Sequence, residues 1–260
     1  MLMFIRIALL VAMCSLLSAC VGNGYQEFYQ PAPYAPNAIA TPTPFTGAPQ
    51  VMASSGNLDD DEAHMYEKGL GLVGAASFTG PAEPEANAIT QAQTVHASVV
   101  LISSHYQSTA TGATPITTPT TTTAYSNGTV GGYGYSGTTT VYGTQTTYIP
   151  YSIDRYEQMA AFFAPLTRAG LGVYLMQVPT DVRQRIGKNG GVMVRTVRHE
   201  SPAYVANIVP GDVILSVDGK TLEQENYGTI IVSTIGRSVK YEIWRSGEMQ
   251  EKDILVPTSW

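Results

Sequence analysis

Residues 170–173 read GLGV, and from this point a regular succession of short elements decides the fold of the rest of the chain. A short helix is expected at 180–187, because threonine is a preferred helix N-cap and glycine often ends a helix. Residues 191–197 are rich in β-branched side chains, which favour a strand. A second short helix is expected from 201–203, since serine is a favoured N-cap and proline suits the first helical position.

The remaining residues of this region predict a sheet. Pro-Gly-Asp at 210–212 turns into the apolar strand 213–217, and Asp-Gly at 218–219 is a tight-turn pair. Alternating apolar and polar residues at 239–245 predict another strand, and the run 252–256 closes the sheet.

One further helix is predicted at 223–235. Its pattern places Tyr227, Ile230 and Ile231 on one face. Gly228 and the β-branched run weaken this prediction, because both lower helix propensity.

Taken in order, these motifs resemble a PDZ domain of the bacterial, circularly permuted kind. Such domains are found on high-temperature-requirement serine proteases, site-2 proteases and carboxy-terminal processing proteases. The resemblance covers residues 168–257, and Asn207 stands where the family usually has glycine; asparagine is the next most tolerant of left-handed backbone. The motifs that carry it are Gly170–Val173, Gly191–Val194, Ser201–Ala203, Pro210–Ile214 and Val217–Gly219.

The resemblance implies a peptide-binding groove. The main-chain amides of Leu171, Gly172 and Val173 would receive the C-terminal carboxylate of a peptide, which then adds as a strand beside 173–177. The alternative is that the apolar residues of this set are ordinary core. The site residues that the resemblance implies are Gly170 and Gly172 for close approach, Leu171, Val173 and Leu175 on one wall, Tyr227, Ile230 and Ile231 on the other, and Arg168 as a charge that attracts the carboxylate.

The N-terminus is typical of a secretory signal. The apolar segment 7–17 is too short to span a membrane, which takes about 20 apolar residues. Leu17–Cys20 resembles the bacterial lipobox, which implies a signal peptide at 1–19 and lipidation of Cys20. We therefore expect a lipid anchor in the bacterial cell envelope, with the outer membrane favoured because Val21 follows the cysteine. An ordinary secretory signal with an incidental cysteine is the alternative.

Two segments separate this anchor from the PDZ-like region. Residues 20–57 are rich in proline and alanine, which predicts a lipidated, disordered tether. Residues 58–167 predict a small α/β domain with a strand at 70–78, a helix at 83–97 and a strand at 98–104. The overall fold class is therefore α+β: a small α/β unit with a β insertion, followed by a PDZ domain, which is a partly open β-barrel with two helices.

The insertion at 108–150 consists mostly of threonine, glycine and tyrosine, and two interpretations of it stay open. It is either a long β-hairpin with turn signals at 127–128 and 136–137, or a disordered low-complexity loop. The apolar residues 156–164 that follow predict a strand that completes the α/β domain.

Composition narrows the function. The net charge of −6 argues against a nucleic-acid-binding protein. The two cysteines, Cys14 and Cys20, are both near the N-terminus, so no disulfide framework or cysteine-based zinc site is expected. No cofactor is expected either. The sequence has no Gly-x-Ser-x-Gly motif, and His199-Glu200 lacks the second histidine of a zinc protease motif.

These observations predict a non-enzymatic adaptor or scaffold. It would bind the membrane through Cys20 and the C-termini or strands of envelope proteins through the groove. The alternatives are a divergent envelope protease or protease regulator, and a structural or secretion-associated component that assembles through 108–150. The apolar Trp260 raises a separate hypothesis of self-association, in which the C-terminus occupies a neighbour's groove.

Overall fold

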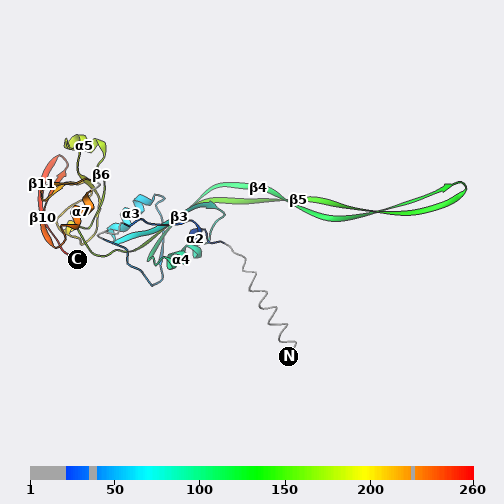
Figure 1. The fold of residues 1–260 in the computed structure, drawn as a ribbon, viewed down its shortest axis with the longest axis horizontal. Helices are drawn as coiled ribbons and strands as arrows, with labels where there is room; N and C mark the ends of the chain where they lie inside the picture. The colour runs from blue at the N-terminus through cyan, green and yellow to red at the C-terminus, as the bar shows by residue number, and fades with distance from the viewer. Residues whose placement is uncertain (1–21, 35–39, 224–225) are drawn as a thin grey trace, which may run out of the picture. The chain divides into compact units, whose positions relative to one another are not determined.

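The structure is a computed structural model that describes residues 22–34, 40–223 and 226–260 (Figure 1). Cys20, the predicted lipidation site, lies outside these residues. No helix among the described residues is long and apolar enough to cross a membrane. The chain forms two compact units: a main unit of residues 1–78, 83–104 and 157–260, and a second unit, the ribbon, of residues 79–82 and 105–156.

The first sheet of the main unit has five strands in the order β1-β3-β5-β4-β2. The predicted strand, helix and strand between residues 70 and 104 are confirmed as β3, α4 and the start of β4, and the strand predicted at 156–164 is the end of β5. In chain order the elements are α2 (Gly24–Glu27), β1 (Tyr29–Pro31), β2 (Gln50–Ala53), α3 (Leu58–Glu67), β3 (Leu70–Gly80), α4 (Glu85–Thr94), β4 (Val99–Val130) and β5 (Tyr133–Pro165).

Helices α3 and α4 cover opposite faces of this sheet. Successive side chains of a strand point to opposite faces, and two neighbours on β5 divide between two cores. Phe162 belongs to the core that contains Ala88 and Ala92 of α4. Phe163 belongs to the core that contains Met65 of α3.

Part of the segment predicted as a disordered tether differs from that prediction. Within residues 20–57 the structure has α2, β1 and β2, and the side chain of Tyr25 is only 1% exposed. Tyr25 packs edge-on against Phe78 of β3, with the ring centroids 5.2 Å apart. The proline-rich composition predicts disorder and does not reveal these contacts. A few buried aromatic side chains are nevertheless enough to order an otherwise polar segment.

The second sheet of the main unit is the region that resembles a PDZ domain. Its strands lie in the order β11-β10-β8-β7-β6, and β9 pairs with β8. Its elements are β6 (Val173–Gln177), α5 (Thr180–Ile186), β7 (Val192–Val197), α6 (Pro202–Val205), β8 (Val213–Val217), β9 (Lys220–Thr221), α7 (Tyr227–Val232), β10 (Arg237–Arg245) and β11 (Glu248–Val256).

Local signals explain most of this region. Gly187 ends α5 with a left-handed backbone, and the side chain of Ser201 accepts a hydrogen bond from the N–H of Tyr204 at the start of α6. Asn207 has a φ of 53°, so asparagine does adopt the left-handed conformation expected at that position. Helix α7 is shorter than the predicted helix at 223–235.

The ribbon is a two-stranded hairpin formed by the outer parts of β4 and β5, so the first of the two open interpretations is the one observed (Figure 1). The turn lies at Gly131 and Gly132, whose φ angles are 62° and 88°. The turns predicted at 127–128 and 136–137 were therefore wrong, since both dipeptides lie within strands.

Candidate peptide-binding groove

Residues 170–172 before β6 form the glycine loop, and all three of their carbonyl groups accept hydrogen bonds from within the protein. The carbonyl of Gly170 accepts from the indole N–H of Trp260 at 3.1 Å. The carbonyl of Leu171 accepts from the N–H of Ala203 at 3.0 Å, and that of Gly172 from the N–H of Arg198 at 2.9 Å. Within the part of the chain that the structure describes, the N–H groups of Leu171 and Gly172 have no hydrogen-bond acceptor. The loop therefore presents two unpaired donors, the arrangement that binds an anion.

Two features require glycine at position 172. Its φ of 78° lies in the left-handed region. A Cβ atom at this position would overlap the Cβ of Ser201. Ser201 is fully buried and caps α6, so it cannot move away without releasing that helix.

Strand β6 lies at the end of the second sheet, next to β7 only. It runs antiparallel to β7, with Val173 opposite Val197. The carbonyl of Val173 accepts a hydrogen bond from the phenol of Tyr66 on α3 at 3.1 Å. One main-chain acceptor at the edge of β6 is thus already used by a side chain from the α/β region.

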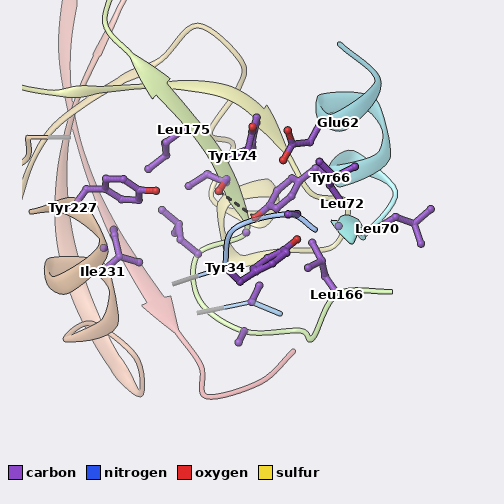
Figure 2. A pocket seen from close by; sticks show the side chains of 18 of the residues that line it. Tyr34, Glu62, Tyr66, Leu70, Leu72, Leu166, Tyr174, Leu175, Tyr227 and Ile231 are labelled. Carbon is purple, nitrogen blue, oxygen red and sulfur yellow. Dashed lines mark hydrogen bonds between the residues drawn. The ribbon is translucent and has the colours of Figure 1, made fainter. Parts of the chain in front are cut away.

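A cavity of about 540 Å³ lies beside this strand. Figure 2 shows Tyr227 and Ile231 of α7 on one side of it, and Tyr34, Tyr66 and Leu166 on the other. The wall from the PDZ-like region consists of Ala169, Leu171, Gly172, Val173, Tyr174, Leu175, Tyr227, Gly228 and Ile231. The opposite wall consists of Ala32, Pro33, Tyr34, Ala40, Glu62, Tyr66, Leu70, Gly71, Leu72 and Leu166.

Six of the nine predicted site residues line the cavity, namely Leu171, Gly172, Val173, Leu175, Tyr227 and Ile231. Leu171 and Ile231 are also core residues, 2% and 3% exposed, so the groove and core interpretations both hold for them. Ile230 packs against the same core from outside the lining. Gly170 lies in the loop and bonds to Trp260. The guanidinium of Arg168 pairs with the exposed carboxylate of Glu200 at 3.6 Å.

Three of the phenols that line the cavity have raised pKa values. Burial raises the pKa of Tyr34 to about 12 and that of Tyr174 to about 12, and the neighbouring carboxylate of Glu62 adds to both shifts. Burial also raises the pKa of Tyr66. The pKa of Glu62 itself is raised, chiefly by burial, although the hydrogen bond from Tyr174 acts in the opposite direction. The cavity is therefore apolar, with phenol donors and one carboxylate on its walls.

Trp260 lies against its own chain. Besides the indole contact to Gly170, its main-chain N–H donates to the carbonyl of Arg168 at 3.4 Å. The guanidinium of Arg198 lies over the indole ring at 4.8 Å from the centroid. In this chain the indole therefore packs against its own glycine loop, and the entry of Trp260 into a neighbour's groove stays a prediction.

The wall from the α/β region was missed by the sequence analysis. Tyr34 comes from the segment predicted as a tether, and Tyr66 and Leu166 come from the region predicted as the α/β domain. Contacts at both ends of α3 join this helix to the PDZ-like region: the N–H of His199 donates to the carbonyl of Glu67 at 3.2 Å, and Arg195 pairs with Asp60 at 2.9 Å. No local motif encodes such a contact.

Among the described residues, no group of three or more histidine, cysteine, aspartate or glutamate side chains is placed to hold a metal ion.

Comparison with known proteins identifies the C-terminal region. Residues 169–256 match the family model described as PDZ domain. The chain is 32% identical over 95 residues to a probable periplasmic serine endoprotease DegP-like of Pseudomonas putida (strain W619), covering 35% of this chain and 20% of that protein. It is 33% identical over 88 residues to the magnetosome formation protease MamE of Magnetospirillum gryphiswaldense, covering 31% of this chain and 11% of that protein.

A solved structure, the HtrA3 PDZ domain bound to a phage-derived ligand (FGRWV), matches with 18% identity and a TM-score of 0.30, covering 34% of this chain and 85% of that one. The chain thus spans a fifth or less of the length of these two curated relatives. Its C-terminal part is a PDZ domain of the HtrA/DegP type, as the motifs predicted.

Proposed function

We propose that this chain is a lipid-anchored envelope protein whose PDZ groove binds the C-terminal end, or an extended strand, of other envelope proteins. The observation that carries the proposal is the pair of unpaired N–H groups at Leu171 and Gly172. They lie beside an edge strand and an apolar cavity. The cavity volume of about 540 Å³ is within the range of ligand sites in proteins.

The groove offers three kinds of contact to a peptide. The loop amides receive the terminal carboxylate, because hydrogen bonds to a charged acceptor are the stronger kind. The edge of β6 pairs with the peptide main chain by β-augmentation. Leu175, Tyr227 and Ile231 surround the last side chain, which is therefore expected to be apolar.

Tyr66 competes with such a ligand. A peptide strand beside β6 needs the carbonyl of Val173 as an acceptor, and the phenol of Tyr66 already donates to it. Binding therefore requires the Tyr66 phenol to release that carbonyl. The α/β region would then set the affinity of the groove as well as form its second wall.

The anchor is part of the same proposal. Cys20 would carry the lipid after removal of residues 1–19, and two or more acyl chains anchor a protein stably. The periplasmic assignment in the names of the DegP-like relatives supports an envelope location. A Cys20→Ser variant is expected to move from the membrane fraction to the soluble envelope fraction; an unchanged distribution would exclude the anchor.

We further propose that the chain acts without catalysis, as an adaptor. The cavity supports this, since its lining is apolar and tyrosine-rich with Glu62 as its carboxylate. A protease regulator is the second candidate, favoured because both curated relatives above are named as proteases. Hydrolysis of casein by the purified chain would contradict the adaptor, and a changed rate of a partner protease would favour the regulator.

The direct test is a display screen of peptide C-termini against the chain, followed by calorimetry with a selected peptide. We expect a shared apolar last residue. Amidation of that peptide's carboxylate should weaken binding by roughly 10- to 100-fold, the value of hydrogen bonds to a charged group. Equal affinity of the acid and the amide would show that the glycine loop does not hold a carboxylate.

A further inference from the structure

The ribbon has two unlike faces. Five cross-strand pairs share one register: Thr117 with Thr146 by a hydroxyl contact of 3.1 Å, and Gly112 with Tyr151, Gly128 with Tyr135, Gly137 with Ser126 and Gly143 with Thr120 by side-chain proximity. In a hairpin, directly opposed residues share a face, and neighbours along a strand alternate. The register therefore assigns every residue between Thr109 and Asp154 to one face or the other.

Every isoleucine and valine of the ribbon falls on the same face, which we call the aliphatic face. The opposite face, the threonine face, carries most of the threonines together with Tyr125, Tyr142 and Tyr148. The five aliphatic residues are 43–72% exposed. They are Ile116, Val130, Val141, Ile149 and Ile153.

Two aromatic rings extend the aliphatic face. The ring of Tyr151 lies over Gly112 and that of Tyr135 lies over Gly128, so these rings cover two of the gaps that glycines leave on this face. Exposed branched aliphatic side chains arranged in a stripe are a typical sign of an interaction surface. A two-stranded hairpin is by itself only marginally stable in water, which favours a second layer of sheet.

Charge and area indicate what the second layer is. Residues 86–153 contain no aspartate, glutamate, lysine or arginine, so two copies of the ribbon do not repel each other and offer no charge to an oppositely charged partner. From Thr109 to Val130 the ribbon is about 70 Å long and its two strands are about 10 Å wide, so one face measures about 700 Å². Two such faces bury about 1,400 Å², within the range of stable specific interfaces.

We propose that the aliphatic face of the ribbon packs against the aliphatic face of a second copy of this chain. The two hairpins then form a two-layer β-sandwich with the layers about 10 Å apart. The same patch serves on both copies, as in a two-fold symmetric dimer. This inference is independent of the groove, because none of its residues lines the cavity.

The test compares two double substitutions that differ only in the face they alter. The chain from residue 20 onward, with Cys20→Ser so that no lipid drives association, is examined by sedimentation equilibrium. Val141→Lys with Ile149→Lys places two ammonium groups on the aliphatic face, where burying an unpaired charge is costly. Tyr142→Lys with Tyr148→Lys, one residue further on or back, places the same charges on the threonine face.

We expect the parent chain to dimerise and the aliphatic-face variant to dissociate at least about 100-fold more readily. The threonine-face variant should stay within about threefold of the parent. A parent chain that remains monomeric overturns the proposal, and so does equal weakening by both variants, which would indicate an edge contact or general repulsion. Val141→Thr with Ile149→Thr keeps β propensity, so it should weaken the dimer while far-ultraviolet circular dichroism shows that the ribbon is still formed; an unchanged dimer contradicts the proposal.

Discussion

In the PDZ domain, Val239, Tyr241 and Ile243 of β10 are at most 2% exposed, whereas Tyr133 and Tyr142 on the ribbon part of β5 are 83% and 80% exposed. Both segments are strands with alternating side chains, but only the first has a core to bury them in. The stability of the PDZ domain therefore depends on buried contacts. That of the ribbon depends on cross-strand pairs worth about 0.2–1 kcal/mol each and on whatever covers its aliphatic face.

A buried ion pair illustrates the first kind of contact. Asp212 is fully buried in the turn before β8, and both its oxygens accept from the guanidinium of Arg245, at 2.6 and 2.7 Å. The N–H of Val209 also donates to this carboxylate at 2.9 Å. A bidentate ion pair thus links the Pro-Gly-Asp turn to β10.

The largest expected effect comes from breaking that contact. Asp212→Asn removes the charge that pairs with the Arg245 guanidinium. Because that guanidinium is partly exposed, the free energy of unfolding should fall by about 1.5–3 kcal/mol, the value of hydrogen bonds to a charged group. Urea unfolding of this variant and of a control variant measures the loss in the free energy of unfolding. Asp181→Asn is the matched control, because Asp181 pairs with Arg185 in an exposed position, at side-chain exposures of 73% and 62%. Its loss should stay below about 0.5 kcal/mol, and equal losses would show that burial does not separate the two pairs.

The next prediction concerns the glycine loop. Gly172→Ala forces a Cβ against Ser201 and should lower peptide affinity by at least about tenfold. Gly219→Ala is the control, since Gly219 has a similar φ of 75° but open space around it. It should cost about 1–2 kcal/mol of stability from backbone strain and leave peptide affinity unchanged. If Gly219→Ala weakened the peptide as much, the loss would reflect general destabilisation rather than the loop.

The difference between local and tertiary signals explains what the sequence could predict. Strand alternation, the Ser201 cap and the left-handed Asn207 are encoded within a few residues, so the PDZ elements and six of the cavity-lining residues were predicted from their motifs. The register of the ribbon depends on pairing along both strands, which overrides the turn preference of Asn127-Gly128.

The residues that form the second wall of the groove could not be predicted from local motifs, because tertiary packing brings them there. Tyr66 reaches Val173 because α3 packs beside β7, and Tyr34 reaches the cavity from a segment whose proline content predicts disorder. Neither contact leaves a periodicity or a motif in the sequence. The same holds for the packing of Trp260 under Arg198.

Tyr66→Phe tests whether that second wall competes with the ligand. Removing the phenol frees the carbonyl of Val173 from a hydrogen bond worth about 0.5–1.5 kcal/mol. Peptide affinity should therefore rise by about 2- to 12-fold in calorimetry. Tyr174→Phe is the control, because the Tyr174 phenol bonds to Glu62 and not to the main chain of β6. A lower affinity for Tyr66→Phe would show that the phenol supports the ligand instead of competing with it.

A smaller effect, on the pH dependence of stability, is expected from substituting Glu62. Its pKa is raised above its ordinary value of 4.5, mainly by burial, so the folded protein binds this proton more tightly than the unfolded chain does. Stability contributed by the protonated form is therefore lost as pH rises above 4.5. Glu62→Gln should flatten this loss by less than about 0.5 kcal/mol, because the side chain is only partly buried. A steeper pH dependence in the variant would contradict this sign.

The smallest effect on the PDZ domain should come from the largest change in sequence. Replacing residues 108–150 by a short glycine turn removes most of a unit that is compact by itself and contributes no residue to the groove. The free energy of unfolding of the PDZ domain and its free energy of peptide binding should then each change by less than about 0.5 kcal/mol, as for surface substitutions. The same deletion should abolish dimerisation, since it removes Ile116, Val130, Val141 and Ile149 together. A deletion variant that kept its dimer would show that association lies in the main unit, whereas one that lost peptide binding would show that the two units are coupled.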